Sequence, residues 1–248
     1  MDPAYPLIVG VTATFFLAGI VKGVTGMGLP TVAMALLGSM LGPLAAAMLL
    51  LVPSLVTNLW QLFAGPRFLP IAARLWPMMV AILVGTVIGA QILTRGDTQA
   101  TTAALGIALC LYALVTLFWR PVTMPPRLEP VATPLVGLVT GLITGATGVF
   151  VIPAVPYLQS LGLPRDDLIQ ALGLSFTTST IALALGLQWH GGIGSEGLVA
   201  SCLAVAPALL GMWAGQALRV RISQAAFRRV FLIFLLLLGM DMAARPLW

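Results

Sequence analysis

Charged side chains are scarce in this chain. Of its 248 residues only 8% are charged, with 7 acidic and 12 basic side chains, whereas 60% are hydrophobic. A soluble domain carries about 25% charged residues, so this composition excludes an ordinary soluble protein. Apolar runs of about 20 residues, each able to cross roughly 30 Å of hydrocarbon, recur along the whole length. We therefore expect an all-α polytopic membrane protein.

Residue types that carry catalysis or bind metals are equally scarce. His190 is the only histidine, no G-x-S-x-G motif occurs, and no cluster of metal-ligating side chains is present. We therefore expect no enzyme, no cofactor and no metal. Cys110 and Cys202 lie in separate apolar segments without a C-x-x-C pattern, which favours packing roles. A membrane thiol-redox relay and a structural membrane subunit remain as alternatives.

The net charge of +5 comes from arginines between the apolar runs. This placement is typical of membrane topology rather than of nucleic-acid binding, so the lipid bilayer is the expected partner and nucleic acid is not. A homodimer is left open. The first residues, "MDPAYPLIVG", have no basic region, so no cleaved signal peptide is expected.

Polar and proline-rich breaks divide the chain into two units. The stretch "RPVTMPPRLEP", 120–130, has four prolines and is interpreted as a linker between a first repeat, 1–119, and a second repeat, 131–248. The expected apolar segments are 6–41, 43–64, 69–94, 98–119, 131–161, 166–188, 195–218 and 224–243.

Three pairs of motifs support a duplication. "GIVKGVTGMGLP" (19–30) recurs as "GLVTGLITGATGVFVIP" (137–153), and "GTVIGAQIL" (85–93) recurs as "GMWAGQAL" (211–218). The polar stretches "PSLVTN" (53–58) and "SFTTST" (175–180) follow the two glycine motifs. Each unit is therefore expected to contain one glycine-broken or re-entrant segment and three transmembrane helices.

The arginines indicate how the two units are oriented. If every apolar segment crosses once, five arginines lie on one side and six on the other. If 131–161 enters and leaves on the same side, nine share one side and only Arg95 and Arg245 lie opposite. The positive-inside rule favours the second arrangement, which makes the units inverted repeats. It predicts that loops 65–75, 120–130 and 219–229 are cytoplasmic.

The glycine motifs are candidate helix breaks. Irregular backbone in a membrane is tolerated where it is buried in protein or lines a cavity, and broken helices expose N–H groups with partial positive charge. Two breaks that meet at the midplane would bind an anion. Two alternatives stay open: that the glycines form helix-packing faces, and that Lys22 snorkels to the interface. The candidate substrate-binding residues are Lys22, Thr25, Gly26, Gly28, Asn58, Thr144, Gly145, Thr147, Gly148 and Thr178.

The stretches "AGIVKGVTGMGLPTVAMALLG" and "VGLVTGLITGATGVFVIPAVPYLQSLGLP" resemble the paired glycine motifs of the sulfite exporter TauE/SafE family. The G-x-x-x-G helices before "AQIL" and "QALRVRIS" are similar to that family's third and seventh helices. The resemblance implies a transporter of the bacterial cytoplasmic membrane for sulfite, sulfonate, sulfoacetate or other organic anions, typically outward. Because the carboxylates lie in tails, connections or a helix end, we expect efflux driven by the membrane potential rather than a carboxylate proton relay.

Overall fold

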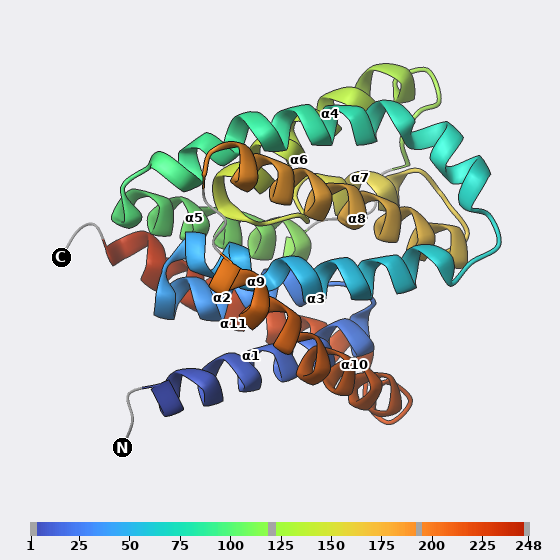
Figure 1. The fold of residues 1–248 in the computed structure, drawn as a ribbon. Helices are drawn as coiled ribbons and strands as arrows, with labels where there is room; N and C mark the ends of the chain where they lie inside the picture. The colour runs from blue at the N-terminus through green and yellow to red at the C-terminus, as the bar shows by residue number, and fades with distance from the viewer. Residues whose placement is uncertain (1–3, 119–122, 192–194, 246–248) are drawn as a thin grey trace.

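The computed structural model describes residues 4–118, 123–191 and 195–245 (Figure 1). These residues form eleven helices and no strand, which confirms the all-α fold. The predicted linker 120–130 lies only partly within the described residues. The helices are α1 (Ala4–Thr25), α2 (Leu29–Leu41), α3 (Pro43–Phe63), α4 (Phe68–Arg95), α5 (Thr98–Phe118), α6 (Glu129–Thr147), α7 (Ala154–Ser160), α8 (Arg165–Trp189), α9 (Ser195–Leu203), α10 (Val205–Arg219) and α11 (Gln224–Ala244).

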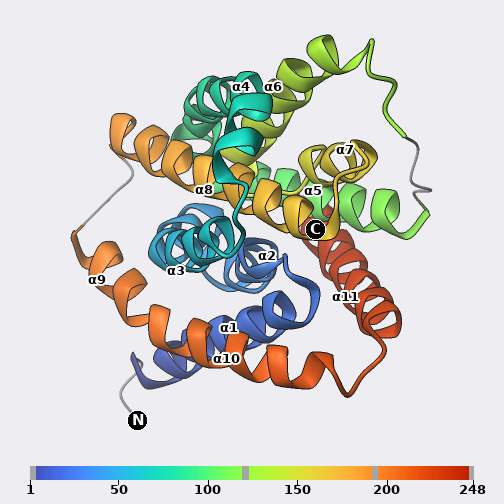
Figure 2. The ribbon, with the colours of Figure 1, turned by 90° about the vertical axis from the view of Figure 1, so that its right-hand side faces the viewer.

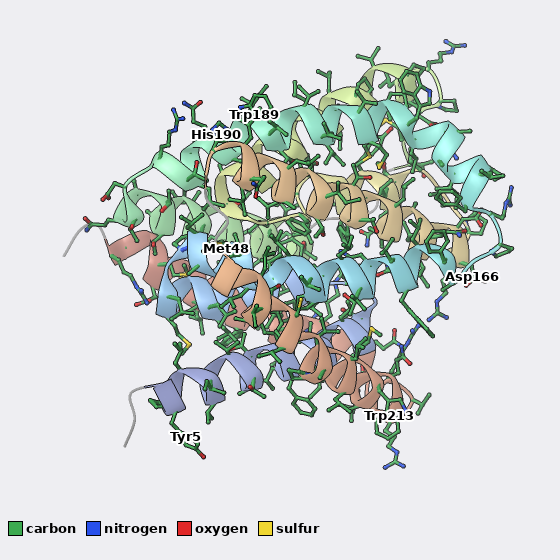
Figure 3. The ribbon with its side chains drawn as sticks, viewed as in Figure 1. Tyr5, Met48, Asp166, Trp189, His190 and Trp213 are labelled. Carbon is green, nitrogen blue, oxygen red and sulfur yellow. The ribbon has the colours of Figure 1, made fainter. Side chains whose placement is uncertain are left out.

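Within the described residues, seven helical stretches are long and apolar enough to cross a membrane. They are α1, α3, α4, α5, α6, α8 and the nearly continuous stretch of α9 and α10. Large apolar side chains cover the outside of the molecule, and both Tyr5 and Trp213 point away from it (Figure 3). An apolar surface of this extent suits lipid rather than water. The fold is that of a polytopic membrane protein.

The first glycine motif breaks the helix between α1 and α2. Gly26 and Gly28 have φ angles of 79° and 101°, a left-handed conformation that glycine adopts without steric cost. Pro30 then lies in the first turn of α2, where its missing N–H is not needed. With 13 residues, α2 is about 20 Å long and is too short to cross the bilayer.

The second glycine motif also breaks a helix. α6 ends at Thr147, Gly148 has a φ angle of 69°, and the chain stays non-helical up to the seven-residue α7. The segment begins and ends at the same end of the molecule, since the backbone N–H of Met124, just before α6, donates to the oxygen of Ser160 at the end of α7 at 2.8 Å. Glu129 at the start of α6 pairs with Arg74, and Asp167 at the start of α8 pairs with Arg67 at 3.3 Å.

Two seams of facing glycines hold each broken helix against a helix of the other half. α1 packs on α10 and α4 packs on α6 with almost no side chain between their backbones. A Cβ atom on Gly85 would lie only 2.5 Å from the carbonyl oxygen of Leu138. The glycines face each other in the same order along each pair, so both pairs are parallel. The facing pairs are Gly19 with Gly211, Gly23 with Gly215, Gly85 with Gly141, and Gly89 with Gly145.

Two other large contacts are antiparallel. Gly106 of α5 lies against Gly239 and Ala243 of α11, whereas Cys110, further along α5, lies closer to the start of α11. α3 and α8 also run in opposite directions. Figure 2 shows them in the middle of the molecule, between the α1–α10 pair and the α4–α6 pair.

The starts of α4, α6, α8 and α11 and the end of α10 lie at the end of the molecule that faces the viewer in Figure 2, which we call the basic end because most arginines lie in or beside these helix ends. At the other end, Arg245 donates to the backbone oxygen of Ser39 at 2.9 Å and pairs with Asp241, and Arg95 ends α4. Arg120 lies outside the described residues. The arginines of the basic end are Arg67, Arg74, Arg127, Arg165, Arg219, Arg221, Arg228 and Arg229.

Candidate functional site

Lys22 is the centre of a buried polar network. Its side chain is 3% exposed and lies near the end of α1, facing α3. The ammonium Nζ donates to Thr57 Oγ1 at 3.1 Å and to Asn58 Oδ1. No described Asp or Glu pairs with it. An ammonium has three N–H donors, so one remains for a ligand.

The helical spacing of α3 and α8 positions the partners of Lys22. Thr57 donates to the backbone oxygen of Pro53 at 2.8 Å, which orients its oxygen toward Lys22. Asn58 Nδ2 donates to Thr180 Oγ1 at 3.3 Å, and Thr180 donates to the backbone oxygen of Phe176 at 2.7 Å. The network therefore connects α1, α3 and α8. Because a lysine in a membrane is costly, such a network indicates a functional role.

A cavity of about 180 Å³ lies beside this network, toward the basic end. Two of its lining residues are cations, Lys22 and Arg219, and the described lining residues include no Asp or Glu. One water occupies about 30 Å³, so the cavity has room for roughly six waters or for a small anion. We call it the Lys22 cavity, and it is lined by Lys22, Gly23, Gly26, Thr57, Trp60, Gln61, Ala64, Ile169, Met212, Gln216 and Arg219.

Residues of the first break divide between the cavity and its surroundings. Gly26 lines the Lys22 cavity, and a Cβ atom there would meet nothing within 4 Å. Thr25 Oγ1 lies 2.8 Å from the backbone oxygen of Val21 and 2.7 Å from that of Met27, so its single O–H donates to the backbone at the end of α1. Gly28 lies against Val21 and does not line this cavity.

Residues of the second break lie elsewhere. Thr144 donates to the backbone oxygen of Val149 at 3.2 Å, and Thr147 donates to that of Ile143 at 2.7 Å. A Cβ atom on Gly145 would lie 2.5 Å from the backbone nitrogen of Ala90, within the α4–α6 seam. On Gly148 it would lie 2.7 Å from the sulfur of Met34. None of the four predicted residues of this break (Thr144, Gly145, Thr147 and Gly148) lines the Lys22 cavity.

Two of the predicted site residues, Lys22 and Asn58, are in direct contact, and Asn58 then donates to Thr180 rather than to the predicted Thr178. Thr178 instead donates toward the sulfur of Met79 on α4 at 3.2 Å. Sequence reasoning assigned no site role to Thr57 or Arg219. In the sequence, Arg219 contributes only to the positive-inside argument, although it follows the G-x-x-x-G motif of α10, which packs against α1, the helix of Lys22.

Further unpartnered hydroxyls lie in the interior of α3 and α8. Ser54, Ser175 and Ser179 are fully buried and have no hydrogen-bond partner among the described residues. Buried polar groups in native proteins are normally satisfied by protein, water or a ligand. These hydroxyls add to the polar character of the two central helices.

The sequence was compared with known families and proteins. The profile described as "Sulfite exporter TauE/SafE" matches residues 11–242, which include both glycine breaks, Lys22 and Arg219. The comparisons with curated proteins and with solved structures found no match. Since the profile covers essentially the whole chain, this chain belongs to the sulfite exporter TauE/SafE family of membrane transporters.

Proposed function

We propose that the chain exports a small sulfur-containing anion, of the sulfite, sulfonate or sulfoacetate class, across the cytoplasmic membrane. The observation that carries this proposal is the Lys22 cavity, where two cations meet with no described carboxylate. Membership of the family supports the substrate class and the outward direction.

The environment of Lys22 explains why an anion would bind there. Its ammonium is surrounded by neutral acceptors and has no counter-ion among the described residues. A charge buried without a counter-ion is unfavourable, and an entering oxyanion supplies the missing charge. Each hydrogen bond to a charged group contributes about 1.5–3 kcal/mol. Arg219 and the amide of Gln216 offer further donors nearer the basic end.

The basic end is proposed to be cytoplasmic. Eight of the ten described arginines lie there, as the positive-inside rule requires. Loops 65–75, 120–130 and 219–229 then face the cytoplasm, and the Lys22 cavity receives its anion from that side. The inside-negative potential drives each negative charge outward with about 2.3 kcal/mol per 100 mV.

Helix directions support an inverted repeat. α1 is parallel to α10, and α4 is parallel to α6. Short connections reverse the chain between α4 and α5 and between α10 and α11, and α5 and α11 are antiparallel. It follows that α1 and α6 run in opposite directions. We propose alternating access by movement of one such unit against the other.

The second break stays a prediction as a substrate-binding element. Its threonines donate to nearby backbone oxygens, and the backbone of α4 occupies the space where a side chain on Gly145 would lie. In the conformation seen here, we propose that the first break and α3 hold the anion without it.

A thermal-shift screen of the purified protein tests the proposal. Sulfite, sulfate, thiosulfate, taurine, sulfoacetate and small carboxylates are added to wild type, Lys22→Gln and a control, Arg221→Gln, which lies outside the Lys22 cavity. We expect selective stabilisation by a sulfur-containing anion in wild type and in the control, and none in Lys22→Gln. A well-folded wild type that no anion stabilises would contradict the proposal, as would a Lys22→Gln protein that responds like wild type.

A further inference from the structure

A second basic cavity, of about 290 Å³, lies on the other side of the first break. It is partly open and is bounded by the break, α5 and α11. Thr25 and Met27 of the break line this cavity, whereas Gly23 and Gly26 line the Lys22 cavity. The same short segment therefore separates the two. We call it the Arg228 cavity, and it is lined by Thr25, Met27, Tyr112, Gln224, Ala225, Arg228 and Phe231.

Tyr112 gives the Arg228 cavity an open hydrogen-bonding group. The residue as a whole is 3% exposed and lines the cavity, and its hydroxyl is not among the fully enclosed polar atoms that lack a partner within the described residues. A buried tyrosine hydroxyl normally has a partner. Because Tyr112 lines the cavity, its hydroxyl can bond there to water or to a bound molecule that displaces the water.

The charge of the cavity selects an anion. Arg228 lines it, and no Asp or Glu occurs among the described lining residues. An adjoining cavity of about 310 Å³ shares Ala225 and Arg228 and adds Arg229 and Gln159. Across residues 4–118, 123–191 and 195–245, the ion pairs use other arginines, so Arg228 and Arg229 have no carboxylate partner there.

We propose that the Arg228 cavity is a second oxyanion site, in which the Arg228 guanidinium of α11 and the Tyr112 hydroxyl of the adjacent α5 bind the ligand. A guanidinium presents several N–H donors in a plane and suits a sulfur or phosphorus oxyanion. The ligand is a free small oxyanion from the cytoplasmic side. A phospholipid phosphate has the same chemistry, so the experiment separates the two sources.

The test counts the anions bound per chain. Wild type in phosphatidylcholine nanodiscs is equilibrated with [³⁵S]sulfite without oxygen. We expect two sulfite ions per chain in wild type and in the control Arg221→Gln. One is expected in Arg228→Gln and one in Lys22→Gln. Tyr112→Phe, which removes only the hydroxyl, should weaken one of the two sites about tenfold.

Each outcome bears on the second site separately from the first. Three results would overturn the second site: Arg228→Gln binds two sulfite ions, wild type binds one ion that is lost in Lys22→Gln, or wild type binds none. A loss in Arg228→Gln but not in Lys22→Gln would support the second site and contradict the proposed function of the Lys22 cavity. If nanodiscs with phosphatidylglycerol reduce wild type from two ions to one, and Arg228→Gln is unaffected, the site stands and lipid phosphate competes for it.

Discussion

The α4–α6 seam predicts that one methyl group on Gly145 destabilises the protein. In Gly145→Ala the added Cβ would lie 2.5 Å from the nitrogen of Ala90 and 2.7 Å from the carbonyl carbon of Gly89, and it would lie closest of all to the oxygen of Thr86. All three atoms are backbone, so no side chain can rotate away. Carbon atoms pack best about 3.5–4.0 Å apart, so α4 and α6 must separate.

The size of the effect follows from two opposing terms. Overpacking of a tight interface costs about 1–3 kcal/mol, and contact with backbone on three sides places this case in the upper part of that range. Replacing glycine by alanine inside a helix returns about 0.5–1 kcal/mol. The expected net loss in the free energy of unfolding is about 1–2.5 kcal/mol.

Gly197→Ala is the matched control. Gly197 is also helical, but a Cβ atom there would lie 3.5 Å from the sulfur of Met48, an ordinary contact. This variant should be unchanged or more stable by up to about 1 kcal/mol. Unfolding in mixed micelles of increasing SDS fraction, followed by circular dichroism, measures both variants. A Gly145→Ala protein as stable as the Gly197→Ala protein would refute the close approach of α4 and α6.

Three further predictions concern other parts of the molecule. Pro53 leaves the backbone oxygen of Leu49 without its helical donor, and Ser201 Oγ donates to that oxygen at 2.8 Å. Ser201→Ala should therefore lower the free energy of unfolding by about 1–3 kcal/mol, and no change would show that the oxygen finds another donor. The Arg74–Glu129 pair is partly exposed, so Arg74→Gln should lower the free energy of unfolding by at most about 1 kcal/mol. A larger loss in the same unfolding assay would contradict a surface pair. In a Cys110→Ser, Cys202→Ser background, Arg127→Cys and Arg221→Cys should react with a maleimide from the cytoplasm and Gln99→Cys from outside; labelling of all three from one side would contradict the proposed orientation.

Local patterns in the sequence were sufficient to predict both helix breaks. Glycine at Gly26, Gly28 and Gly148 permits left-handed backbone, and the structure has positive φ at all three. The membrane character follows from the length of the apolar runs. Lys22 was a candidate because a charge inside an apolar segment needs a reason to be there.

Long-range packing explains what the sequence could not predict. Small residues at spacing four predict that a helix has a close partner, but not which helix, so the pairing of α1 with α10 and of α4 with α6 required the structure. The same is true of Thr180, since the choice between neighbouring threonines depends on how α8 is rotated against α3. Arg219 enters the candidate site only because α10 lies beside α1.

Efflux from proteoliposomes tests whether the anion pathway passes the Lys22 cavity. Vesicles containing wild type, Lys22→Gln or Arg221→Gln are loaded with [³⁵S]sulfite, and an inside-negative potential is imposed with valinomycin and a potassium gradient. We expect the potential to accelerate efflux through wild type and Arg221→Gln, whereas Lys22→Gln should release sulfite no faster than vesicles without protein. Efflux through Lys22→Gln at the wild-type rate would contradict an anion pathway that passes the Lys22 cavity.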